Sequence, residues 1–409
     1  MQRHPLDAPR LLLAALVAAG CSSVWADEPS PYYIGVSQAF THDSNVYRLP
    51  TGVTPLNGGR SDTYSSTSLL GGFDQPIGRQ RFHASANVSA NRFQDHDTLN
   101  NTGYGLNAGW DWATIEKLSG NVFVGLNQSL ASLENSALTP LTSGRNLIKT
   151  DQFGGRVQWG GASLLTLQAN YAHSRVRYSD PSYIESRSSQ DSVGLGAYYQ
   201  LSGAIRLGTG LRFTNSEMGE TQINKTNGRN LDLTADWQSG GRTAANARLS
   251  WTRQSNSTVG GRDFSGLTGA LGVSYAPTAK LAFNAALSRD AGVYSSFYNL
   301  NNAGQNTPIF GLSENSRATN ALSLGARYAA TAKISINAGA QYRRANLVDP
   351  GGAESSDTLR SMSLGANYAI ARNWLLACNV SHLSRSLEGN VTYEAPANIA
   401  SCSAQFTWR

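Results

Sequence analysis

The sequence predicts an all-β protein: a transmembrane, antiparallel, up-and-down β-barrel of about 18 strands, with short periplasmic turns and longer extracellular loops. Three observations predict it: a nearly continuous alternation of apolar and polar side chains, a regular series of aromatic residues, and connections that alternate between short and long. Charged residues make up only 15% of the chain, and its polarity comes from Gly, Ser, Asn, Thr and Gln. This composition is not that of a charged, disordered protein.

The alternation has a period of two residues. Between residues 333 and 343 the even positions hold Ile, Ala and Tyr, whereas the odd positions hold Lys, Ser, Asn, Gly, Gln and Arg. Successive side chains of a strand point to opposite faces, so this stretch predicts a strand with one apolar face. The stretches 122–130 and 205–213 follow the same pattern. The mature chain has no comparable helical period of 3.6 residues.

One aromatic residue closes every second predicted strand. Successive members lie 38 to 53 residues apart, which is the length of two strands with their connections. The turn after most of them is short, as in "APTAK" and "AATAK", whereas the segments 43–61, 133–148 and 291–315 are long and rich in Gly, Asn, Ser and Thr, as exposed loops are. The predicted aromatic girdle is Phe73, Trp112, Trp159, Tyr199, Trp237, Tyr275, Tyr328, Tyr368 and Trp408.

The composition of the two faces favours a membrane barrel over a soluble β-protein. A soluble sandwich needs large branched residues on its inward face. Here the apolar face carries the aromatic residues and the other face is Gly, Ser and Asn, as in a barrel whose outside contacts lipid. Closure pairs every strand edge, and about 18 strands leave an aqueous lumen. A β-helix or propeller also repeats, but does not explain the alternating connections.

Residues 1–26 are predicted to be a cleaved signal peptide, followed by a single barrel domain over 27–409. Arg3 and Arg10 precede the apolar run 11–20, and Ala26 ends a small-x-small cleavage site. Cys21 leaves a lipoprotein signal as the alternative. The chain is exported in both cases, and the barrel pattern predicts the outer membrane of a Gram-negative bacterium. The final "SAQFTWR" resembles the last strand of such barrels, with one residue added after the aromatic.

The charge balance predicts no nucleic-acid partner. Loss of Arg3, Arg10 and Asp7 with the signal peptide lowers the formal net charge from +6 to +5. The mature chain has no basic cluster of the kind that binds a phosphate backbone. Its partners are therefore expected to be the lipid outside the barrel and a solute within it.

Two cysteines, Cys378 and Cys402, remain in the mature chain. An even number in an exported protein predicts a disulfide. A last hairpin centred near residue 390 places the two opposite one another, both facing lipid. We therefore predict a cross-strand disulfide between them.

Nine charged residues alternate with the apolar positions of their strands and are therefore expected to face the lumen. Six of them are arginines, which predicts a basic pore lining that favours anionic or polar solutes. The alternative is that the charges pair with each other on a wet wall, and a turn centred near residue 240 places Asp232 opposite Arg248. Tyr198, an aromatic able to stack on a sugar ring, also has lumen parity. The nine are Asp111, Arg156, Arg206, Arg212, Asp232, Asp236, Arg248, Arg327 and Arg343.

The sequence predicts no catalytic site, no metal site and no cofactor. The mature chain has five histidines, and no pair of them has metal-ligand spacing. His382 with Ser381 and Ser384 nearby is the candidate for a lipid-modifying barrel enzyme. Serine is so abundant that this adjacency carries little weight.

The first long loop carries the one compact motif. "FTHDSNVYRLP" contains Asp43, Asn45, Val46, Tyr47 and Arg48 directly after the first predicted strand. It resembles the porin-type outer-membrane barrels associated with exopolysaccharide biosynthesis and export, and the segments 61–82 and 95–120 are similar to them in style. The resemblance implies passage of a secreted polysaccharide and periplasmic export proteins as partners.

The leading hypothesis is therefore a channel that exports an exopolysaccharide. The alternatives are a general or sugar-preferring diffusion porin for uptake, a lipid-modifying enzyme and an adhesive barrel. A lumen of Gly, Ser, Asn and Thr with a few arginines suits a polysaccharide and a small solute alike. The solute, the direction of transport, the number of subunits and the path of 291–315 stay open.

Overall fold

The computed structural model describes residues 30–53, 59–131, 145–160, 163–221, 223–257, 263–291, 294–296, 310–312, 316–348, 354–388 and 393–409. The predicted signal peptide, residues 1–26, and the candidate lipidation site Cys21 lie outside these ranges. Within them, no helix is long and apolar enough to cross a membrane.

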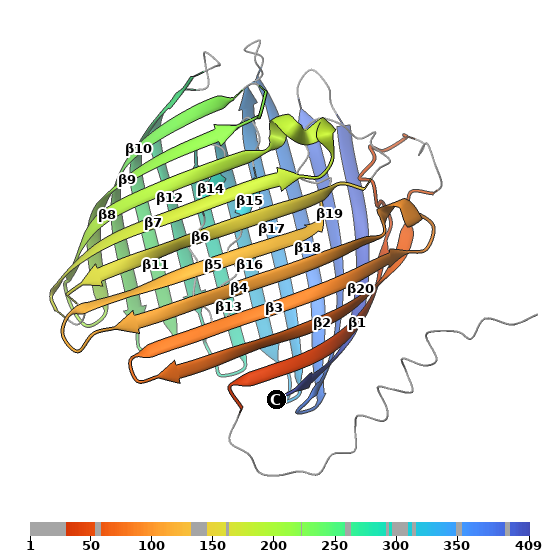
Figure 1. Cartoon of the computed structure of the whole chain (residues 1–409), viewed down its shortest axis with the longest axis horizontal. Coiled ribbons are helices and arrows are strands. Elements are labelled where there is room, and N and C mark those ends of the chain that lie inside the picture. The colour runs from red at the N-terminus through yellow and green to blue at the C-terminus, as the bar shows by residue number, and fades with distance from the viewer. Residues whose placement is uncertain are drawn as a thin grey trace, which may run out of the picture.

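The described residues form one antiparallel sheet of 18 strands that closes on itself, because β1 pairs with both β2 and β20 (Figure 1). The predicted fold class is confirmed. The strands are β1 (Tyr32–Asp43), β2 (Asp62–Ile77), β3 (Gln80–Phe93), β4 (Asn101–Ala113), β5 (Leu118–Leu130), β6 (Leu147–Trp159), β7 (Leu165–Tyr178), β8 (Ser188–Gln200), β9 (Ile205–Met218), β10 (Asn224–Ser239), β11 (Thr243–Asn256), β12 (Phe264–Tyr275), β13 (Leu281–Asp290), β16 (Ser316–Ala329), β17 (Ile334–Val348), β18 (Glu354–Ala371), β19 (Trp374–Glu388) and β20 (Tyr393–Trp408).

The connections differ at the two ends of the barrel. The C terminus lies at the end with the short turns in Figure 1. The opposite end carries the 3-10 helices η1 (Asp97–Leu99) and η2 (Pro181–Ser186), and a separate two-stranded hairpin of β14 (Tyr294–Ser296) and β15 (Phe310–Leu312) belongs to the connection from β13 to β16. Four connections at the end opposite the short turns, 219–223, 257–263, 349–353 and 389–392, are nevertheless short. The prediction of longer extracellular loops therefore holds for part of this end only.

The outward face of the wall is apolar. Leu195 is 56% exposed and Leu233 is 54% exposed, although both lie in the middle of strands. Large exposed apolar side chains on a closed barrel would be unfavourable in water, and they gain stability when lipid covers them. The alternation seen in the sequence is thus the alternation between lipid and lumen.

The nine aromatic residues predicted to form a girdle lie near the short-turn end. Each pairs with a residue at or near the periplasmic end of the neighbouring strand, as Tyr275 does with Thr243 and Tyr368 with Ile334. Eight of the nine are 36% exposed or more, whereas Trp112 is partly covered and lies 6.3 Å from the Trp110 ring. We propose that this row marks the periplasmic boundary of the membrane.

Cys378 lies directly opposite Cys402 on β19 and β20, and a disulfide joins them. Their Cα atoms are 4.1 Å apart. Both side chains are exposed on the lipid side, in the outward parity of Val380, which is 54% exposed. The sequence-derived hairpin centre near residue 390 matches this register.

The disulfide predicts the thiol content of the mature protein. Alkylation without reductant is expected to label no cysteine, and reduction is expected to release two thiols, as counted by mass spectrometry. The Cys378→Ser variant is the control, because Cys402 then has no partner and one thiol must react in both conditions. Two reactive thiols in the unreduced wild-type protein would contradict the bond.

Candidate functional site: the lumen wall

The lumen wall is the face opposite the exposed apolar side chains. Arg212, for example, lies between Leu211 and Phe213, which are 49% and 46% exposed on the lipid side. By the same alternation the structure places all nine residues predicted to line the pore on the inner face, on β4, β6, β9, β10, β11, β16 and β17. Their role in selecting a solute remains a prediction.

Ion pairs between β9 and β10 neutralise two of the predicted arginines. Arg206 Nη2 lies 2.8 Å from Asp236 Oδ2, and the Arg206 guanidinium is 5.2 Å from the centre of the Tyr198 ring. Further along the same strands, Arg212 Nε lies 3.0 Å from Asp232 Oδ2. Each pair is a charge-assisted hydrogen bond, the stronger kind of hydrogen bond.

The predicted juxtaposition of Asp232 and Arg248 is wrong. Asp232 lies opposite Ser250, and Arg248 lies opposite Thr234. The turn is centred on Gly241 rather than on residue 240, because Gly240 and Gly241 both adopt positive φ, at 53° and 75°. A shift of one residue in a turn centre moves the register of the whole hairpin by two residues.

Arg248 reaches across β12 to Asp290 at the end of β13. The Arg248 Nη2 to Asp290 Oδ1 distance is 2.9 Å, and the two side chains are only 2% and 9% exposed. Beside them Thr252 shares a hydroxyl hydrogen bond with Thr268 and donates to Asn230, both at 2.7 Å. This sector of the lumen wall is therefore a packed polar layer, in which a buried charge depends on its partner.

A second buried cluster joins β17, β18 and β19. Asp357 accepts two hydrogen bonds from Arg385, at 2.8 and 3.0 Å, and lies 3.6 Å from Arg343 Nη2. All three side chains are at most 11% exposed. Sequence reasoning missed Asp357 and Arg385, although both have the lumen parity that would have found them.

Asp111, Arg156 and Arg327 lie towards the short-turn end, as the Arg206–Asp236 pair does, and are more open than the buried clusters. Asp111 lies 3.5 Å from His83, with about half of its side chain exposed. Arg156 and Arg327 are exposed, and in the described part of the chain neither forms an ion pair. Arg156 precedes Trp159 by three residues and Arg327 directly precedes Tyr328, so both lie near the aromatic row. The predicted basic lining is thus largely neutralised, except at this end.

These observations decide where the chain belongs. A closed sheet with an apolar outside and a wet, charged inside satisfies every backbone group within lipid, which a transmembrane structure must do. The chain is an outer-membrane β-barrel. Its predicted location in the outer membrane of a Gram-negative bacterium is confirmed.

The barrel is similar in fold to solved outer-membrane proteins of Pseudomonas aeruginosa. OpdK, solved alone and with vanillate, is 12% identical, with a TM-score of 0.46, and covers 92% of this chain and 99% of its own. OccK2 (OpdF) is 12% identical, with a TM-score of 0.49, and covers 92% and 98%. No family model and no curated protein matches the chain.

The predicted export of an exopolysaccharide is wrong, and the comparisons do not support periplasmic export proteins as partners. The residues of the first-loop motif that carried the resemblance bond to other residues of the chain itself. The Asp43 carboxylate pairs with Arg48 at 2.8 Å, and Asn45 bonds to Leu49 and to the Pro396 carbonyl, each at 2.9 Å.

The first loop, which follows β1, is thus hydrogen-bonded to β20. Asn45 is 2% exposed, and the Thr51 amide donates to the Glu394 carbonyl at 2.9 Å. Arg48 adopts a left-handed backbone conformation, with φ of 51°, and its guanidinium bonds both carboxylate oxygens of Asp43. The residue types of the motif follow from the geometry of this loop.

A buried carboxylate, that of Asp62, holds the loop between β3 and β4 through hydrogen bonds. Asp62 accepts hydrogen bonds from the His96 ring and from the His96 amide, both at 2.9 Å, and its side chain is 0% exposed. Tyr47 packs edge-on against the His96 ring, with 5.0 Å between centres. Burial, reinforced by the Asp62 carboxylate, raises the pKa of Tyr47 above its ordinary value.

The candidate hydrolase residues do not form a catalytic pair. The His382 ring bonds to Asn398 at 2.8 Å, and Ser384 donates to Glu394 at 2.7 Å. Ser381 has the opposite parity to His382, so it faces the lumen. Across the described ranges, no group of three or more His, Cys, Asp or Glu residues is placed to hold a metal ion.

Proposed function

We propose that the barrel is a non-enzymatic diffusion porin for small polar solutes, with a preference for anions. The observation that carries this proposal is the contrast within the lumen wall. Arg206, Arg212, Arg248 and Arg343 have carboxylate partners, whereas the exposed Arg156 and Arg327 have none in the described residues. The proposal includes a mature domain over 27–409 after cleavage of residues 1–26.

A diffusion channel has to attract a solute without retaining it. Paired charges present a nearly neutral, hydrogen-bonding wall along most of the lumen. Two unpaired guanidinium groups near the periplasmic end add a local positive potential, which raises the concentration of anions there. Together they favour weak passage of small polar or anionic molecules.

A contact at the end of β13 supports passage of a small solute rather than a wide one. Gln254, which has lumen parity, donates from its Nε2 to the Ala291 carbonyl at 2.8 Å. Ala291, which directly follows β13, therefore lies on the inner side of the wall. The neighbouring polar side chains of the lumen wall are buried, with Ser250 0% exposed and Ser288 3% exposed. We infer that the lumen is narrowed over β11–β13.

Conductance in planar bilayers tests the proposal. The purified barrel is expected to open channels whose reversal potential in a salt gradient shows anion preference. The Arg156→Gln/Arg327→Gln double variant is expected to lower the ratio of anion to cation permeability by about two- to threefold, because it removes the unpaired positive charge.

The matched control is Arg289→Gln/Arg360→Gln, which removes the same charge from the lipid side and should leave the ratio unchanged. A sealed barrel would rule out the porin. An open channel whose ratio is the same in wild type and in the lumen double variant would rule out the anion preference alone.

A further inference from the structure

Two arginines lie opposite each other on the lipid side of the wall. Arg229 on β10 pairs in register with Arg253 on β11, and both are exposed. They have the outward parity of Leu231 and Trp251, which are 49% and 61% exposed. Like charges directly opposite on neighbouring strands are destabilising, so this arrangement calls for an anion between them.

The described residues do not supply that anion. Among the described residues, no carboxylate pairs with Arg229 or Arg253, in contrast to the paired arginines of the lumen. The nearby Asp191 lies on β8, two strands from Arg229, and is already engaged. It accepts hydrogen bonds from the Tyr171 hydroxyl at 2.7 Å and from the His173 ring at 2.9 Å.

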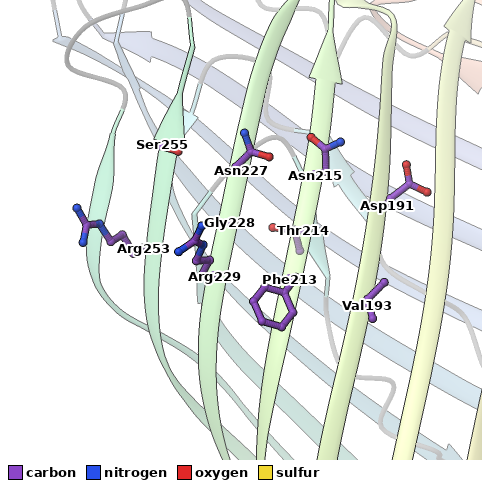
Figure 2. Close-up of a pocket in the computed structure, with 10 residues that line it drawn as sticks. All are labelled: Asp191, Val193, Phe213, Thr214, Asn215, Asn227, Gly228, Arg229, Arg253 and Ser255. Atoms are coloured by element: carbon purple, nitrogen blue, oxygen red, sulfur yellow. The ribbon is translucent and has the colours of Figure 1, made fainter.

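The two arginines border a hollow in the outer surface. The hollow has a volume of about 680 Å³ and extends over β8–β11. Figure 2 shows Val193, Phe213, Arg229 and Arg253 in a row across neighbouring strands. The amides of Asn215 and Asn227 lie in the next row towards the extracellular end. The hollow thus offers cationic, amide and apolar contacts on one surface.

The height of the pair places it at the outer boundary of the membrane. Arg229 lies eight residues from Trp237 of the aromatic row, and Arg253 lies ten residues from Thr243, where β11 begins. At about 3.3 Å per residue and a tilt of about 45°, this is a rise of about 19 to 23 Å. The apolar band of such barrels is about 25 Å tall, so the guanidinium groups reach the level of lipid headgroups.

We propose that Arg229 and Arg253 bind the phosphate of a phosphorylated lipid in the outer leaflet. The planar guanidinium groups match the phosphate oxygens, and the phosphate relieves the repulsion between them. The acyl chains of the lipid lie along Leu231 and Trp251, directly below on the same face. The site is on the outside of the wall and does not depend on the solute in the lumen.

Trp251 is a built-in reporter of this lipid. The other tryptophans of the mature chain lie at the short-turn end, so the difference in fluorescence between the wild type and Trp251→Phe isolates the signal from this site. The others are Trp110, Trp112, Trp159, Trp237, Trp374 and Trp408.

The test uses the full mature barrel in phosphatidylcholine vesicles. Phosphatidic acid with brominated acyl chains is titrated in one series and brominated phosphatidylcholine in another. Trp251 is expected to be quenched preferentially by the brominated phosphatidic acid. The Arg229→Gln/Arg253→Gln variant is expected to weaken this preference about 30-fold, the change that about 1 kcal/mol for each of two basic residues corresponds to.

The control is Arg289→Gln/Arg360→Gln, which removes two outward arginines at a similar height, neither of them opposite another arginine. It must keep the preference. Equal quenching by both lipids in the wild type, as when another copy of the chain covers the hollow, would overturn the proposal. So would an equal loss in the control, which would indicate surface charge in general.

Inorganic phosphate distinguishes a lipid from a free anion. Millimolar phosphate is expected to leave the quenching unchanged, and its displacement of the lipid would show that the acyl chains contribute nothing. Folding of every variant is checked by the difference in gel mobility before and after heating. If the double variant did not fold, Arg229→Gln and Arg253→Gln alone must each weaken the preference about fivefold.

Discussion

Replacing Arg248 with alanine is expected to lower the free energy of unfolding by about 3–5 kcal/mol. The substitution leaves the Asp290 carboxylate, 9% exposed, without the guanidinium that lies 2.9 Å from it. An unpaired charge in a packed wall has lost both water and partner, so the folded state is penalised. Equilibrium unfolding in urea, with the barrel in lipid vesicles, measures the change.

A matched pair on the same wall provides the control. Arg206 and Asp236 are also joined at 2.8 Å, but their side chains are 42% and 41% exposed. Water screens such a pair, so Arg206→Ala is expected to cost less than about 1 kcal/mol. Removal of both charges, in Arg248→Ala/Asp290→Ala, should recover much of the loss. Equal losses for Arg248→Ala and Arg206→Ala would contradict the assignment of Arg248 to a buried pair.

Replacing Asp62 with alanine is expected to release the loop between β3 and β4 and to lower the free energy of unfolding by about 3 kcal/mol. Besides the His96 bonds, the Asp62 carboxylate accepts from the amides of Thr63, Gln94 and Asp95 at 2.6 to 3.3 Å. Alanine leaves the Asp95 and His96 amides without this acceptor, whereas the Gln94 amide keeps its bond to the Thr63 carbonyl at 3.1 Å. Hydrogen exchange of the Asp95 and His96 amides should become much faster.

Asp62→Asn separates the contribution of charge from that of shape. The amide oxygen of asparagine can still accept from part of the backbone donors, so exchange should rise less than in Asp62→Ala. The first loop should keep its own bonds in both variants, because Asn45 and Arg48 do not depend on Asp62. If the Asp95 and His96 amides stayed protected in Asp62→Ala, Asp62 would not be the residue that holds this loop.

The strands and their faces could be predicted from the sequence because each depends on a local period. Residues two apart share a face wherever a strand is regular, so the lipid side of Leu233 and the lumen side of Asp232 follow directly. The Cys378–Cys402 register followed in the same way from a hairpin centre near residue 390. Closure then followed from the requirement that no edge remains open in lipid.

The contacts within the lumen could not be predicted, because long side chains do not keep to the register. Arg248 reaches over β12 to Asp290, and Asp232 bonds to Arg212 on the preceding strand rather than to a residue across the following turn. The two glycines at 240 and 241 also moved that turn by one residue. The motif around Asn45 was read as a mark of function because its structural partner, Pro396, is 351 positions away.

That separation matters for how the barrel resists lateral opening. The joint between β1 and β20 connects the two ends of the chain, so it closes the longest loop and has the largest entropic cost of any strand pair. Hydrogen bonds of Asn45 to Pro396 and of Thr41 to Ser401, at 2.9 and 2.8 Å, lie across this joint. The first loop therefore stabilises the β1–β20 pair, the one strand pair that is not joined by a direct chain connection.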